Sequence, residues 1–148
     1  MIAIDKVQEF ERRIDALEPN TKAKWGKMNA TQMLTHMNDA IRIGLGMKAA
    51  VDKSNWFMNK LAFPIVVHLF PGFPRNLLTA PEMKQGKLGS TPRDFYTEAE
   101  FLKKMLEVFN EREGDKLKPH PLFGKLSKQQ WADLLVKHLE HHLQQFGV

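Results

Sequence analysis

The sequence predicts an all-α protein, and three observations lead to this prediction. Apolar residues recur at spacings of three and four along several segments, helix-capping patterns stand at the starts of these segments, and no long stretch alternates with the period of two typical of a strand. Four substantial amphipathic helices predict a four-helix bundle. A length of 148 residues fits a single domain, residues 1–148.

The first predicted helix carries one apolar stripe and ends at Pro19 and Asn20. The stripe consists of Ile4, Val7, Phe10, Ile14 and Leu17. The second predicted helix opens at Asn29, which forms a capping-box pattern with Gln32, and continues towards Gly46. Its apolar residues are Met33, Leu34, Met37, Ile41 and Ile43.

The middle of the chain loses this regularity. An apolar segment from about Ser54 to Phe70 contains Pro64, so we expect a kinked or broken helix. The stretch from Phe70 to Phe95, "FPGFPRNLLTAPEMKQGKLGSTPRDF", holds four prolines and three glycines and has no sustained period. A loop of this length in a compact domain is usually functional or mobile, and we expect it to cover or border the open side of a site formed by the helices.

Two further helices complete the predicted fold. The first is expected to be capped by Thr97 with Glu100 as its partner, and the last starts at Ser127 with Gln130 and ends at Gly147. The expected buried face of the former consists of Phe101, Leu102, Met105, Val108 and Phe109.

The composition excludes several classes of site. The absence of cysteine excludes disulfides, thiolate ligands and a cysteine nucleophile, and it fits a reducing cytoplasm. The N-terminus lacks the pattern of a signal peptide, and the most apolar stretch, "LAFPIVVHLF", is too short to span a bilayer. The net charge of +5 is scattered, so we expect a cytoplasmic protein with neither a membrane nor a nucleic acid as its partner.

The terminal segment "KHLEHHLQQFG" concentrates three of the six histidines. His138 and His142 lie one helical turn apart on the apolar stripe of Trp131, Leu135 and Phe146, so both imidazoles can reach one metal ion. Burying two imidazoles without partners is costly, which favours a metal over the alternative of one satisfied core histidine and solvated neighbours. His141 is offset by about 100° and is expected at the edge or behind a ligand.

His36 on the second helix is the obvious third ligand, because it lies on or beside the apolar face with Met37. Three protein ligands leave an open coordination position, the pattern of catalytic rather than structural zinc. Three neutral imidazoles also leave the +2 charge uncompensated, which would lower the pKa of a water or thiol at that position.

The sequence does not contain the motifs of several other catalytic or binding sites. Glu140 is two residues after His138, so "HLEHH" is not a zinc-protease motif, and no Glu-x-x-His, nucleophile elbow or phosphate-binding glycine loop occurs. Glu140, Gln144 and Gln145 are candidates to orient a ligand, and Asp39 either orients His36 or is solvated. The roles of His68, His120 and His141 stay open.

The same residues carry a resemblance to the DinB-like (YfiT-like) superfamily of metal-binding four-helix bundles. The resemblance is closer to one uncharacterised branch of it, in which "KWGKM", the His of "QMLTHM", "HPLFGKL", Trp131 and the terminal "KHLEHHLQQFG" recur in this order. The resemblance implies an up-up-down-down bundle, frequent dimers, and metal bound by His36, His138 and His142.

The resemblance also sets the functional expectations. Characterised members include transferases and isomerases that use low-molecular-weight thiols, and metal-dependent hydrolases. We therefore expect a zinc- or nickel-dependent transferase or hydrolase acting on a small substrate, with a low-molecular-weight thiol as a candidate partner, in a homodimer. The alternatives are a non-catalytic bundle stabilised by its metal and a basic binding module. Catalytic residues beyond the metal ligands are not identifiable.

Overall fold

The computed structural model describes residues 1–70, 72–73, 81–84 and 86–148. The described part is helical and contains no strand, so the all-α prediction is confirmed. Its long helices are α1 (Ile4–Asp15), α2 (Ala30–Leu45), α3 (Phe95–Glu111) and α4 (Lys128–Phe146). Shorter helical turns are η1 (Met58–Ala62), η2 (Ile65–Leu69), η3 (Pro81–Met83) and η4 (Gly114–Lys116).

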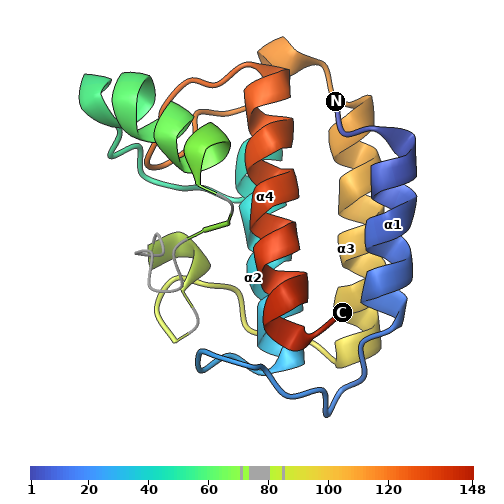
Figure 1. Ribbon diagram of the computed structural model, residues 1–148. Coiled ribbons are helices and arrows are strands. Elements are labelled where there is room, and N and C mark those ends of the chain that lie inside the picture. Colours follow the sequence, from blue (N-terminus) through green and yellow to red (C-terminus); the bar gives the residue numbers. More distant parts are fainter. Residues whose placement is uncertain (71, 74–80, 85) are drawn as a thin grey trace.

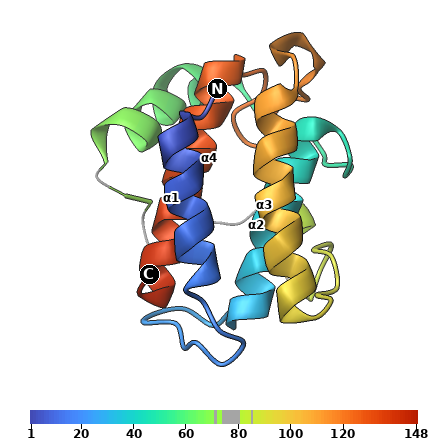
Figure 2. The same ribbon diagram turned by 90° about the vertical axis from the view of Figure 1, so that its right-hand side faces the viewer.

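The four long helices lie side by side (Figures 1 and 2). Helices α1 and α4 run in one direction and α2 and α3 in the other (Figure 1), so the expected up-up-down-down order is wrong. The physical reason is connection length. The long connection between α2 and α3 lets the chain return to the end at which α2 began, so that α3 runs parallel to α2.

One apolar core draws on all four long helices. Phe10, Leu34, Phe109 and Leu139 are each at most 1% exposed. The apolar stripes of α1 and α2 face this core, with two exceptions: Ile4, at the first position of α1, is 71% exposed, and Ile43 of α2 packs in a separate small cluster with Ala40 and Met83. Ile2 is buried instead, because the chain before the helix folds inward and Asn110 binds both the Ile2 amide N–H and carbonyl.

Capping residues fix the ends of α2 and α4 as the sequence predicts. Asn29 with Gln32, and Ser127 with Gln130, form complete capping boxes. Gly46 ends α2 in the left-handed region with φ +75°, a conformation that costs little only for glycine. These fixed ends hold the register of the two helices that carry the candidate ligands.

The predicted cap of α3 is wrong. Asp94, not Thr97, occupies the N-cap, and its carboxylate accepts the Thr97 backbone N–H at 3.0 Å. Both residue types cap helices well, but Phe95 is buried in the core, so the helix must begin before Thr97.

The helical segment Trp56–Leu69 is not broken at Pro64, since Phe63 and Pro64 both keep helical backbone angles. Two π-helical turns, η1 and η2, flank Phe63 and Pro64, because proline has no N–H to continue the helical hydrogen bonds. The segment lies outside the four long helices (Figure 1, green). Only Phe63 and Val67 of this segment are buried. Within the described ranges, no helix has the length and apolar character needed to cross a membrane.

Candidate metal centre

Three histidine side chains from two helices converge on one point. The Nε2 atoms of His36 and His138 are 2.9 Å apart, and those of His138 and His142 are 3.1 Å apart. All three lie within 4.8 Å of one another, so together they could hold a metal ion. Nitrogen atoms bound to one tetrahedral zinc at 2.0–2.1 Å are about 3.3 Å apart, so a small outward movement would admit the ion.

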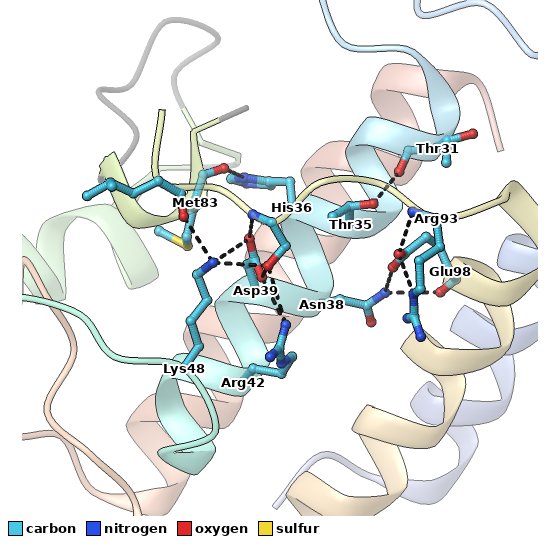
Figure 3. A network of polar contacts seen from close by, with 12 residues as sticks. Thr31, Thr35, His36, Asn38, Asp39, Arg42, Lys48, Met83, Arg93 and Glu98 are labelled. Carbon is cyan, nitrogen blue, oxygen red and sulfur yellow. Dashed lines mark hydrogen bonds and ion pairs between the residues drawn. The ribbon is translucent and has the colours of Figure 1, made fainter. Parts of the chain in front are cut away.

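His36 is oriented by a backbone carbonyl from the Phe70–Phe95 stretch. Its Nδ1 lies 3.0 Å from the Met83 carbonyl oxygen, which can only accept, so Nδ1 carries the proton (Figure 3). The Nε2 atom of the neutral ring then has a free lone pair directed at the cluster. The turn η3 therefore sets the tautomer that a metal ligand requires.

His142 is oriented in the same way by a side chain on its own helix. Its Nδ1 lies 2.8 Å from Oε1 of Gln145, and Gln145 donates through Nε2 to the Trp25 carbonyl at 2.7 Å. The second contact fixes which end of the amide faces His142. Two of the three imidazoles thus present Nε2 lone pairs to the same point.

His138 lies between the other two rings. A neutral His138 has at most one Nε2 proton for two facing lone pairs, so hydrogen bonding alone leaves the cluster short of donors. A cation removes this deficit. Phe73 packs edge-on against His138, with ring centroids 5.4 Å apart, and shields one side of the cluster.

Burial keeps the three rings neutral. It lowers the pKa of His142 to about 3 and is the main reason why the pKa values of His36 and His138 also fall below their ordinary range. Neighbouring histidines add to the effect at His138 and His142. Neutral imidazole is the form that binds metals.

Of the other residues expected to orient a ligand, only Gln145 contacts one of the three histidines. Gln145 is the residue behind a ligand, whereas Glu140 pairs with Arg13 and Gln144 donates to Glu140 away from the cluster. The sequence predicts that Asp39 either orients His36 or is solvated. It is fully buried and accepts from Ser90, so both expectations are wrong. The ring of His141 lies beside those of Trp25, Phe73 and His142, at the edge of the cluster.

Part of the Phe70–Phe95 stretch borders the histidine cluster, as expected, whereas its place relative to an open coordination position stays a prediction. Phe73 and Met83 both contact the histidine cluster. Residues 71, 74–80 and 85 lie outside the described residues. No pattern in the sequence identified Met83, because its contribution is a backbone carbonyl and not a side chain.

His120 is buried and does not belong to the histidine cluster. It lines a small cavity of about 20 Å³ together with His138 and Met83. Its Nδ1 accepts the backbone N–H groups of Leu122 and Phe123 at 3.1 and 3.2 Å. The neutral ring therefore carries its proton on Nε2. Gly124 closes this turn through two backbone hydrogen bonds to His120, with φ +71°, and a Cβ there would lie 2.6 Å from Ser54 Oγ.

We expect His120 to make the metal-free protein less stable in acid. Burial lowers its pKa to about 4, whereas a histidine in the unfolded chain has its ordinary pKa of 6.5. Between these values the unfolded chain binds more protons, so stability falls as the pH drops from about 6.5 to about 4, by at most about 3 kcal/mol. Urea unfolding of metal-free protein across this range measures the slope.

The matched variant is His120→Asn, whose Oδ1 can replace Nδ1 as the acceptor without titrating. Its stability should fall less steeply with acid than that of the wild type, and the titration of the remaining histidines cancels in the difference. Parallel curves for the two proteins would show that His120 contributes nothing.

Comparison with known proteins gives a family but no activity. The model of a family described as protein of unknown function (DUF1569) matches residues 2–147. No curated protein and no solved structure gives a match.

Proposed function

The chain belongs to the DUF1569 family of proteins of unknown function, and we propose that it binds a divalent transition metal through His36, His138 and His142 for transfer or hydrolysis on a small substrate. Zinc and nickel are the ions we favour, because both accept imidazole nitrogen readily. The DinB-like resemblance of the sequence supports a thiol-dependent transferase slightly more than a hydrolase.

The observation that carries this proposal is that three histidine side chains could bind one ion and no fourth protein ligand lies beside them within the described residues. No other His, Cys, Asp or Glu joins the cluster within the described part of the chain. The residues outside that part, 71, 74–80 and 85, include none of these four types. Three protein ligands and an open position are typical of catalytic zinc, whereas structural zinc has four protein ligands.

The chain's own groups have defined tasks in this proposal. An ion bound there would act as a Lewis acid and lower the pKa of a water or thiol. Met83 and Gln145 hold the ligand rings in the binding tautomer. Phe73 limits access of water, and His120 offers an Nε2–H donor to the small cavity that borders His138.

We also propose the DinB-like bundle type and a homodimer. The three-histidine cluster supports the bundle type. The segment Trp56–Leu69 supports the dimer, because Trp56 is 70% exposed and Leu69 is 75% exposed, and apolar patches of this kind often mark interfaces.

We expect turnover that requires both the metal and a second reactant. The test is a panel of small electrophiles and esters, assayed with and without low-molecular-weight thiols, on metal-loaded and metal-stripped protein. Thiol-dependent turnover that disappears with the metal supports a transferase, and turnover without thiol supports a hydrolase. His68→Ala, which removes an exposed histidine, serves as the control and should retain activity.

The second candidate function is a non-catalytic bundle stabilised by its metal. The burial of His36 and His142 favours it, because buried ligands can serve stability alone. Stoichiometric metal with no exchangeable coordination position, and no turnover on the panel, would support this alternative and exclude the catalytic proposal.

A further inference from the structure

A second polar site lies on the side of α2 that faces α3, away from the three histidines. It is a cleft of about 360 Å³, lined among others by Asp39 and Arg42 of α2, Arg93, and Glu98 of α3. None of the three candidate ligands lines it. Its volume lies within the range of small-molecule sites.

Two buried carboxylates, those of Asp39 and Glu98, line this cleft (Figure 3). Asp39 is fully buried, and its oxygens accept the Ser90 backbone N–H at 2.7 Å and the Ser90 hydroxyl at 2.6 Å. Lys48 Nζ lies 3.2 Å from Asp39 and directs its other protons to Ser90 and the Leu88 carbonyl. The charge of Asp39 is therefore compensated without Arg42.

Glu98 on α3 is only 3% exposed. One of its oxygens accepts both the backbone N–H and the side-chain Nε–H of Arg93, at 3.1 and 2.9 Å, and the other accepts Asn38 Nδ2–H at 2.7 Å. Burial opposes ionisation, but the hydrogen bonds from Arg93 and Asn38 outweigh it and hold the pKa of Glu98 below its usual range. Glu98 is thus a fixed anion that anchors Arg93.

Both arginines keep donors for another group. A guanidinium has five N–H donors. Arg93 uses only Nε, and Arg42 reaches Asp39 and Ser90 only through Nη1, at 3.4 Å, within the described chain. Arg42 is 29% exposed and Arg93 is 50% exposed, and Arg93 is held further by packing of its guanidinium 4.7 Å from the centroid of the Phe101 ring.

The charged side chains that line the cleft balance one another, Asp39 and Glu98 against Arg42 and Arg93, and Lys48 binds Asp39 from outside the lining. Because Lys48 already compensates Asp39, the guanidinium groups of Arg42 and Arg93 are available to a further anion. We propose that this cleft binds a small oxyanion, a carboxylate or a phosphate group, between the Arg42 and Arg93 guanidinium groups. Planar guanidinium donors match the paired oxygens of both groups. The anchored cations need little reorganisation on binding.

The wall of the cleft carries one more unsatisfied group. Asn38 Oδ1 is buried and has no donor in the described part of the structure. Because Glu98 accepts from Asn38 Nδ2, the amide cannot turn over to hide this oxygen without losing that bond. This oxygen is buried, so a ligand in the cleft does not reach it. Phosphate carries more negative charge than acetate near neutral pH, so phosphate is expected to bind more tightly than acetate between the two guanidinium groups.

The test measures thermal stabilisation and calorimetric binding with inorganic phosphate and with acetate, against sodium chloride at equal ionic strength. The full chain is used both metal-loaded and as His138→Ala, so that binding at the histidine cluster is separated from binding in the cleft. We expect both forms to bind phosphate. Loss of binding in His138→Ala would place the anion at the histidine cluster and overturn the proposal.

The informative variant is Arg42→Met, because Lys48 and Ser90 still compensate Asp39, so we expect the fold to be retained. Phosphate should bind about tenfold more weakly to it, the cost of losing a charged hydrogen bond. Arg12→Met removes an equal charge from an exposed position of α1 and should bind as the wild type does. Equal weakening in both variants, or no anion effect beyond that of chloride, would overturn the proposal.

Discussion

The His138→Ala variant is expected to lose stoichiometric metal binding, with affinity reduced by more than about 100-fold. Loss of a group that merely orients a ligand costs 10- to 100-fold, and His138 is expected to be a ligand itself. Its Nε2 is also the atom that lies within 3.1 Å of both other Nε2 atoms. Metal analysis of protein purified without a histidine tag, followed by competition with a chelator, measures the effect.

The same variant should also lose its stabilisation by metal. At a free ion concentration of about 1,000 times the Kd, binding stabilises the wild type by about 4 kcal/mol. For a chain of this size, this corresponds to a rise in Tm of about 10 °C. His68→Ala is the matched control for adventitious binding by surface histidines. If a variant with all three ligands changed to alanine binds metal as the wild type does, the site lies elsewhere.

Trp131→Ala should cause the largest loss of stability, about 3–5 kcal/mol, because it leaves a large void in the core. Trp131 is 2% exposed, and its indole N–H donates to the Lys118 carbonyl at 3.1 Å. The ring lies so close to α2 that a Cβ at Gly44 would be 3.3 Å from it. It also packs edge-on against His120, at 5.1 Å between ring centroids.

Denaturant unfolding of metal-free protein measures this loss. Trp131→Phe is the companion variant, since it keeps an aromatic ring and loses mainly the hydrogen bond to Lys118 and part of the volume. We expect it to cost about half as much or less. Equal losses for the two variants would show that the hydrogen bond, and not the filled volume, dominates at this position.

The candidate ligands could be predicted because helical periodicity carries the information. The three- and four-residue steps that place His138 and His142 on one face are visible in the sequence, and so is the apolar face beside His36. The carbonyl of Met83 could not be predicted, because every residue has one and its position depends on the path of an irregular segment.

Asp39 shows the same limit on long-range contacts. A single aspartate on a helix is usually solvated, and nothing near it in sequence indicates otherwise. Its burial depends on Ser90, which is 51 residues away. The order of the helices is a further case: periodicity determines which face is buried but not the direction in which a long connection returns the chain.

The two helices that carry the histidines are far apart in the chain, since His36 and His138 are separated by 102 residues. An ion held by both would act as a reversible cross-link that closes a loop of that size and excludes conformations in which α4 detaches from α2. Amide protons in both helices should then exchange with solvent more slowly as metal is added, and the logarithm of the slowing should follow the free energy of binding. Amides in the exposed segment Trp56–Leu69, which contributes no ligand, should exchange at a rate that changes little.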